Sequence, residues 1–110
     1  MMLCTKASAD DVKGRLVPRQ YKDWCIDVTG GDVTNGNHVQ MWECNNLDQQ
    51  EWWWWSDGTL RTKAGGAHWN KCLDLPGGDP TGGAPLQIWD CLDGSPNQKW
   101  GWADWPSVCA

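Results

Sequence analysis

The sequence predicts a single all-β domain, and three observations support this fold class. A segment of the chain occurs twice, first from Cys25 to Trp52 and again from Cys72 to Trp100. Within each copy, residues of alternating character are typical of half-buried strands. Paired glycines separate these stretches and indicate turns between them. A self-match at a constant offset means that the chain uses one supersecondary unit more than once.

The two copies agree at a defined set of positions. Each contains the motif C-x-D, then a Gly-Gly-Asp turn, then Q-x-W-x-C and finally a late Q-x-W. The late motif is displaced by one inserted residue in the second copy. The matching residues are Cys25, Asp27, Gln40, Trp42, Cys44 and Gln50 in the first copy, and Cys72, Asp74, Gln87, Trp89, Cys91 and Gln98 in the second.

Strand alternation predicts which side chains face outward. Around the second cysteine of the first copy, Val39 and Met41 alternate with Gln40 and Trp42. Because Val39 and Met41 are the better core candidates, we expect Gln40 and Trp42 to point outward. If the two cysteines of this copy form a disulfide, Asp27 lies on the same outer face. The same parity applies to the second copy, with Asp74, Gln87 and Trp89 on its outer face.

A carboxylate, an amide and an indole on one exposed surface suit a sugar. Sugar hydroxyls bond to the carboxylate and the amide, and the apolar C–H face of the sugar packs on the indole. With these motifs the sequence resembles the repeats of ricin B-chain-type lectins, which form β-trefoils. The resemblance covers about residues 15–105. It implies a carbohydrate-binding lectin with two Q-x-W repeats, for which galactose and N-acetylgalactosamine are the default ligands.

The resemblance also implies which residues form the two sugar sites. The family uses the aspartate of C-x-D, the glutamine and aromatic residue of the middle strand, and the amide pair before the last tryptophan. The second copy has the expected Asn-Gln pair, whereas the first has Gln-Gln, a departure from the family pattern. The implied site residues are Asp27, Gln40, Trp42, Gln49 and Gln50 in the first repeat, and Asp74, Gln87, Trp89, Asn97 and Gln98 in the second.

The expected organisation is one domain of 110 residues. It comprises an N-terminal arm (1–14), a first repeat (15–58), a second repeat (59–105) and a short tail (106–110). A trefoil needs three such units, and the residues outside the repeats are too few for a third. We therefore expect association of chains into a homo-oligomer to complete the barrel, or else termini linked by a disulfide. A third alternative is that the chain is a trimmed piece of a larger protein.

Six cysteines allow several pairings in principle, but the repeat symmetry selects two of them. It pairs Cys25 with Cys44 and Cys72 with Cys91, and this leaves Cys4 and Cys109 at opposite ends of the chain. Such disulfides suit an oxidising compartment, so we expect a secreted protein, although residues 1–14 do not resemble a signal peptide. No C-x-x-C motif is present, and we predict neither a metal site nor a cofactor.

The run Trp52–Trp55 is the most unusual part of a chain with 11 tryptophans and no phenylalanine. Its first and third members share one face of a strand, and we expect them in the core with their counterparts Trp100 and Trp102. Trp53 and Trp55 should then face outward, where exposed neighbouring indoles need a cover. The candidates are the N-terminal arm, a partner chain or a second sugar subsite.

Charge and residue spacing exclude several other functions. A net charge of −5 and a pI near 4.7 argue against nucleic acid or an anionic membrane as a partner. No apolar run is long enough to span a bilayer. We expect no enzymatic activity, because the acidic residues recur in repeat-related positions instead of forming one asymmetric catalytic pair. The alternatives are a β-trefoil protease inhibitor and the carbohydrate-binding module of a glycoside hydrolase.

Overall fold

The computed structural model describes residues 12–101, and these fold into short antiparallel strands joined by turns. The expected all-β class is therefore confirmed, because the helical segments in this range are single 3-10 turns. The strands are β1 (Val12–Gly14), β2 (Trp24–Val28), β3 (Val39–Glu43), β4 (Trp52–Trp54), β5 (Leu60–Thr62), β6 (Lys71–Asp74) and β7 (Gln87–Asp90). The 3-10 helices are η2 (Thr29–Gly31), η3 (Asp48–Gln50), η4 (Lys63–Gly65), η5 (Pro76–Gly78) and η6 (Pro96–Gln98).

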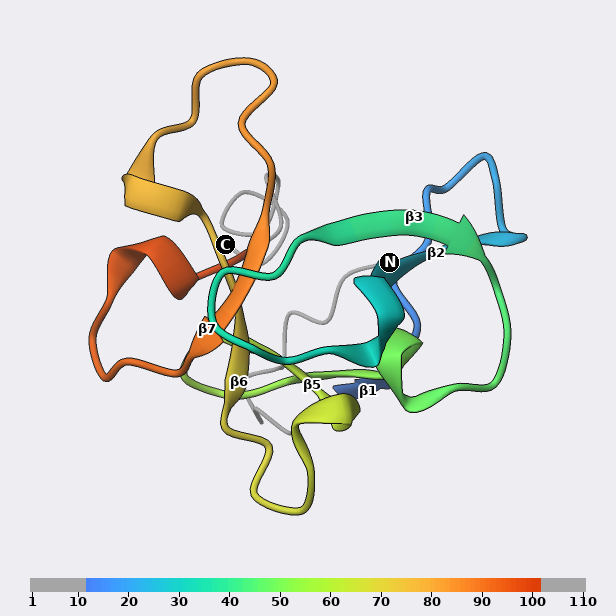
Figure 1. Cartoon of the computed structure of the whole chain (residues 1–110), viewed down its shortest axis with the longest axis horizontal. Helices are drawn as coiled ribbons and strands as arrows, with labels where there is room; N and C mark the ends of the chain where they lie inside the picture. The colour runs from blue at the N-terminus through green and yellow to red at the C-terminus, as the bar shows by residue number, and fades with distance from the viewer. Residues whose placement is uncertain (1–11, 102–110) are drawn as a thin grey trace, which may run out of the picture.

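Each repeat contributes one hairpin with the same register. Ile26 lies opposite Met41 in the β2–β3 hairpin, as Leu73 lies opposite Ile88 in the β6–β7 hairpin. The first hairpin forms a two-stranded sheet of its own, whereas the second belongs to a five-stranded sheet with the order β1-β4-β5-β6-β7. Figure 1 shows the two hairpins side by side, with the first residues of β3 next to β7. The repeat in the sequence is therefore a repeat of structure.

The core lies between these sheets and takes residues from both repeats. Its buried members are Val28, Trp52, Leu60, Leu73 and Ile88. The expected core position of Trp52 is confirmed, because its side chain is 1% exposed. Its indole N–H donates to the backbone carbonyl of Ile26 in β2 at 3.0 Å. This bond satisfies the polar edge of a large apolar residue in a small core.

The equivalent bond recurs in the second repeat, where the Trp100 indole donates to the carbonyl of Leu73 at 3.1 Å. Trp54 and Trp100 are partly buried and pack against the core, as the alternation predicts. Trp102 lies outside the described residues.

The two disulfides predicted from the repeat symmetry are confirmed. Cys25 bonds to Cys44 and Cys72 bonds to Cys91, with Cα–Cα distances of 5.1 and 5.0 Å. Each bond joins the first strand of a hairpin to the residue that follows the second strand, and its N-terminal cysteine is fully buried. The predicted Cys4–Cys109 pair lies outside the described residues.

The loop that connects β2 to β3 holds the first repeat against the second through hydrogen bonds. The backbone N–H of Gly36 donates to the carbonyl of Ile88 at 2.8 Å, and the N–H of Ile88 donates to the carbonyl of Asn37 at 2.9 Å. Figure 1 shows this loop, in teal, reaching across to β7, in orange. Asn35 bonds to the side chain of Asp90 at 3.0 Å, and Lys71 forms an ion pair with the same carboxylate at 2.8 Å.

This loop explains why one core prediction is wrong. Met41 occupies the position in β3 that Ile88 occupies in β7, yet Met41 is 43% exposed whereas Ile88 is fully buried. The loop of the first repeat covers Ile88. Among residues 12–101 no preceding repeat supplies such a loop for Met41. Strand alternation therefore placed Met41 and Ile88 on the same side of their strands, but it could not show that a loop covers only Ile88.

The outward indoles Trp53 and Trp55 are half-buried. Trp53 lies opposite Lys13 of β1, and the Lys13 ammonium is 4.2 Å from its ring centroid. Trp53 also packs edge-on against Trp55 and Trp69, at centroid distances of 5.6 and 4.7 Å. The guanidinium of Arg61 lies 3.6 Å from the Trp55 ring centroid. Strand β1 belongs to the expected N-terminal arm, so that arm supplies part of the cover.

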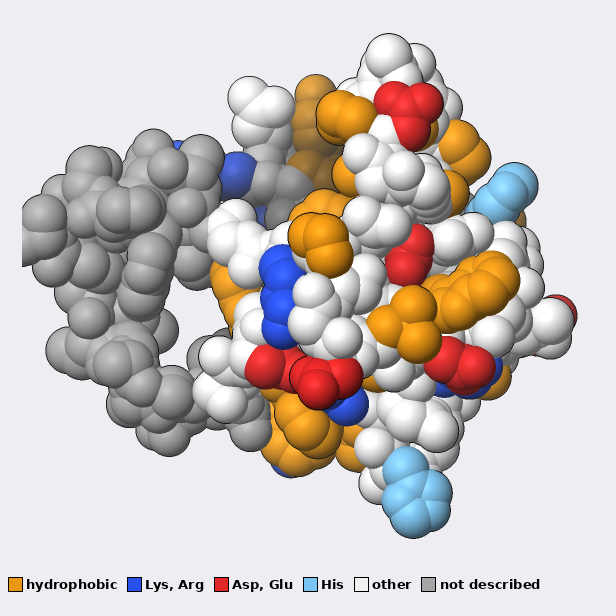
Figure 2. Space-filling model, turned by 90° about the vertical axis from the view of Figure 1, so that its left-hand side faces the viewer, with side chains coloured by type: hydrophobic (Ala, Val, Ile, Leu, Met, Phe, Trp, Pro, Cys, Tyr) orange, Lys and Arg blue, Asp and Glu red, His pale blue; other side chains and the backbone are white. Residues whose placement is uncertain are grey.

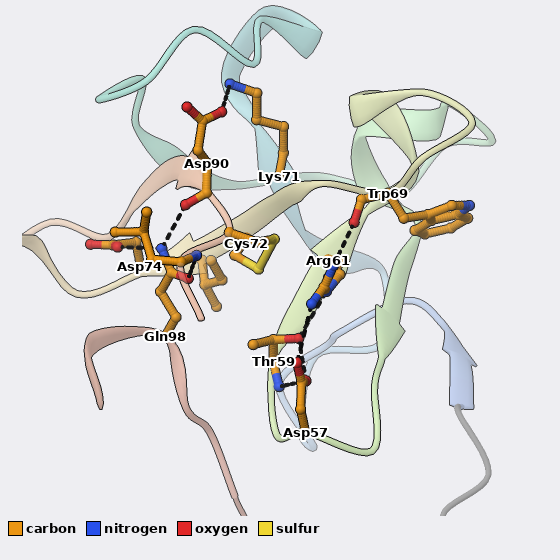
Figure 3. The surroundings of a disulfide bond; sticks show 12 residues. Asp57, Thr59, Arg61, Trp69, Lys71, Cys72, Asp74, Asp90 and Gln98 are labelled. Atoms are coloured by element: carbon orange, nitrogen blue, oxygen red, sulfur yellow. Dashed lines mark hydrogen bonds and ion pairs between the residues drawn. A yellow bond between two sulfur atoms is a disulfide. The ribbon is translucent and has the colours of Figure 1, made fainter. Parts of the chain in front are cut away.

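Arg61 is held in place by a network at the start of the second repeat. Its side chain donates to Thr59, to a carboxylate oxygen of Asp57 at 3.1 Å and to the backbone carbonyl of Trp69 at 3.2 Å. Figure 3 shows this arginine between the Asp57–Thr59 turn and Trp69. The network fixes the cation over the aromatic cluster.

Two expectations about the whole molecule stay predictions. The predicted bounds of the arm, the two repeats and the tail are one of them, because the strand positions alone do not define such bounds. The means by which the barrel is completed, by association of chains, by disulfide-linked termini or by the rest of a larger protein, also stays a prediction. Among residues 12–101 no helix has the length and apolar character needed to cross a membrane.

Candidate functional site

The second repeat gathers its predicted site residues at one end of the β6–β7 hairpin. Asp74 ends β6 and lies directly opposite Gln87, the first residue of β7. Trp89 is two residues further along β7 and therefore on the same face as Gln87. Asn97 and Gln98 follow on the turn η6. Hairpin register and one turn thus bring together residues that are distant in the sequence.

The Asp74 carboxylate is held by two amides. The side chain of Gln87 donates to one carboxylate oxygen at 3.0 Å, and that of Gln98 donates to the other at 2.9 Å. Asp74 is 5% exposed. A carboxylate has about four lone-pair positions, so two of them stay open in this arrangement.

Gln98 is a positioning residue inside the fold. Its side chain is fully buried and bonds three groups at once: the Asp74 carboxylate, the carbonyl of Asp90 at 3.0 Å and the N–H of Leu92 at 2.8 Å. Figure 3 shows Gln98 beside Asp74, with Asp90 above the pair. Gln98 therefore lies on the buried side of the Asp74 carboxylate and fixes the orientation of that carboxylate.

A hollow of about 300 Å³ opens in front of this carboxylate. Its walls include Asp74, Gln87, Trp89 and Asn97, which are four of the five site residues predicted for this repeat. The Trp89 side chain is 36% exposed, so the predicted outward orientation is confirmed. Three further lining residues were not predicted: Gly77, Leu92 and Ser95. They lie in turns next to the motif, where the repeat pattern gives no signal.

The first repeat builds the same arrangement with one difference. Asp27 of β2 lies opposite Gln40 of β3, and Gln40 donates to its carboxylate at 3.2 Å. Gln50 donates to the other oxygen at 2.9 Å from a fully buried position, as Gln98 does in the second repeat. Trp42 is 55% exposed, as predicted. However, Gln49 also bonds to the carboxylate, and Asp27 is fully buried.

Other acidic groups near the hairpins are occupied within their own turns. The side chain and backbone N–H of Thr81 bond to Asp79 and hold the pKa of that carboxyl below its ordinary value. Thr34 lowers the pKa of Asp32 in the same way. Among the described residues no group of three His, Cys, Asp or Glu side chains could hold a metal ion. Figure 2 shows apolar side chains in small groups beside acidic ones on one face.

Fold and geometry together define a protein of repeated hairpins, each with one carboxylate–amide–indole group. The indole of each group is exposed, whereas the carboxylate, predicted to lie on the open outer face, is buried beneath the amides in both repeats. A family model described as the ricin-type beta-trefoil lectin domain matches residues 7–100. The chain therefore belongs to the ricin-type β-trefoil lectin family. Membership in this family supports carbohydrate binding in general terms.

Individual relatives agree with this assignment. Serine protease 1 from Rarobacter faecitabidus is 44% identical over 41 residues, which are 37% of this chain and 8% of that protein. The ribosome-inactivating protein SNAIf from Sambucus nigra is 40% identical over 48 residues, which are 41% of this chain and 8% of that protein. The matches thus span less than a tenth of the length of these relatives.

A solved structure confirms the β-trefoil fold. The designed 3-fold symmetric protein ThreeFoil superposes with a TM-score of 0.62 and 25% sequence identity. The superposition covers 80% of this chain and 61% of ThreeFoil.

Proposed function

We propose that this chain is a non-catalytic lectin that binds galactose or N-acetylgalactosamine-type glycans through its second repeat. The observation that carries the proposal is the hollow in which Asp74, Gln87, Trp89 and Asn97 converge. The choice of sugar follows from the resemblance to ricin B-chain-type lectins.

Each residue has a role that sugar chemistry requires. Asp74 keeps open lone pairs for sugar hydroxyls, and its two amide bonds fix the carboxylate without occupying it fully. Among the described residues, the Asn97 side chain has no hydrogen-bond partner, so its amide is free for a further hydroxyl. The exposed indole of Trp89 offers a flat apolar surface for the C–H face of the sugar.

The same hollow favours binding over hydrolysis. A glycosidase needs two carboxyl groups on opposite sides of the glycosidic bond. Asp74 is the one acidic residue among those that line the hollow. A shallow site with a single carboxylate, two amides and an indole holds a sugar but supplies no acid–base pair.

Affinity for a single sugar should be weak, with a dissociation constant on the order of millimolar, because a shallow site buries little area. Association of chains would then raise avidity without any new contact. The two hairpin disulfides support a secreted location, where multivalent capture of glycans is useful.

A binding module within a larger enzyme is a second candidate. It is favoured by the small share of the long relatives that the chain matches, one of which is named a protease. Carbohydrate binding at the second repeat would be the same in both cases.

Titration of galactose and N-acetylgalactosamine against tryptophan fluorescence tests the proposal, with glucose as the control sugar. We expect saturable binding by the wild type and its loss in Trp89→Ala. Trp42→Ala is the matched control, since it removes the equivalent indole of the first repeat. Equal binding by the wild type and Trp89→Ala would overturn the assignment of the site.

A further inference from the structure

The two repeats differ at the residue before the buried glutamine, which is Gln49 in the first and Asn97 in the second. Both side chains lie across the glycine turn of their own repeat. A Cβ on Gly31 would be 2.9 Å from the amide oxygen of Gln49, and a Cβ on Gly78 would be 2.7 Å from that of Asn97. The amide oxygens are therefore placed alike, and the difference lies in where the amide nitrogen reaches.

In the first repeat the amide nitrogen reaches the carboxylate. Gln49 donates to both oxygens of Asp27, each at 3.2 Å. Together with the bonds from Gln40 and Gln50, this gives the carboxylate four hydrogen-bond contacts. Because a carboxylate has about four lone-pair positions, none is left for a sugar hydroxyl. The full burial of Asp27 agrees with this count.

In the second repeat the corresponding contact is missing. Asn97 is shorter by one methylene, and within the described residues its side chain makes no hydrogen bond to Asp74. The Asp74 carboxylate therefore accepts two bonds instead of four and is slightly exposed, at 5%.

The surface hollows follow the same difference. The hollow of the second repeat is lined by Asp74, Gln87 and Trp89. The hollow beside the first repeat is lined by Gly31, Ala64 and the segment 46–49, and Asp27 is not among its lining residues. The Gln49 side chain lies between that hollow and the carboxylate it bonds.

We propose that Gln49 is an internal ligand that closes the first site, so that each chain binds one sugar, at the second repeat. The inference rests on the proposed function and names the residue that decides which repeat is active. A sugar at the first repeat would have to displace an amide that is tethered beside the carboxylate and therefore present at high effective concentration.

Reciprocal exchange of the two residues tests this. The stoichiometry of methyl galactoside or N-acetylgalactosamine binding is measured by isothermal titration calorimetry at a protein concentration on the order of the millimolar dissociation constant, so that the number of sites is resolved. The wild type should bind one sugar per chain, and Gln49→Asn should bind two. Asn97→Gln should bind none. Adding Trp42→Ala to Gln49→Asn should return the stoichiometry to one, because it removes the indole of the opened site.

The outcomes separate this inference from the proposed function. Two sugars per wild-type chain, or one per Gln49→Asn chain, would overturn the inference and leave the lectin assignment intact. No binding by the wild type to any sugar on a glycan array would overturn both. If Gln49→Asn does not fold, Trp42→Ala in the wild-type background still decides, since it should change neither stoichiometry nor affinity.

Discussion

Replacing Gln98 by methionine should lower the free energy of unfolding by about 4 kcal/mol. The substitution keeps the length of the side chain but removes three hydrogen bonds inside the protein. One is to the Asp74 carboxylate, and two are to backbone groups at the end of β7 and just after it, the carbonyl of Asp90 and the N–H of Leu92. A bond to a charged group contributes roughly 2 kcal/mol, and each neutral one about 1 kcal/mol. That loss is a large part of the roughly 5–15 kcal/mol available to a small domain.

Urea unfolding with the disulfides intact, followed by tryptophan fluorescence, measures this loss. Asn97→Ala is the matched control, since its side chain has no hydrogen-bond partner among the described residues, and its effect should stay within about 0.5 kcal/mol. A loss below about 1 kcal/mol for Gln98→Met would refute the reasoning, because it would mean that water replaces the buried amide at little cost.

Three further predictions concern the disulfides, the aromatic cluster and pH. Replacing both Cys72 and Cys91 by alanine should lower the free energy of unfolding by about 3 kcal/mol, because the disulfide closes a loop with a sequence separation of 19. A thermal melt like that of the wild type would contradict this. Arg61→Lys should cost about 1–2 kcal/mol in urea unfolding, since an ammonium cannot keep three acceptors and an indole in contact at once; an unchanged midpoint would be evidence against the network. Hydrogen bonds from a lysine and an asparagine lower the pKa of Asp90 from its ordinary 3.8. Its stabilising effect is therefore complete above pH 3.8 and is lost as the pH falls through the folded-state pKa. Asp90→Asn should flatten the loss of stability measured over that acid range, and parallel curves for the two proteins would argue otherwise.

Much of the fold follows from the repeated motifs. The two hairpin disulfides, the buried Trp52 and the outward Trp42 and Trp89 were all predicted from spacing and strand parity, and the structure confirms them. These features depend on local alternation and on the equivalence of two copies. Both are properties that a single sequence displays directly.

Three features could not be predicted because they depend on contacts between segments. Asp27 was expected on an open outer face, but glutamines from β3 and from the turn η3 bury it. The exposure of Met41 depends on whether another repeat covers its strand. The motif marked Gln49 as a departure from the family pattern, but it did not show that the longer side chain reaches the Asp27 carboxylate.

The uncovered strand β3 also bears on how the molecule opens locally. The N–H and carbonyl of Ile88 are both bonded to the loop of the first repeat, and no equivalent bond reaches Met41 among residues 12–101. Amides with few cross-chain bonds and little apolar cover exchange through small fluctuations at low free-energy cost. In deuterated water, the Met41 amide should therefore take up the isotope well before that of Ile88, because the first hairpin should open more readily than the second.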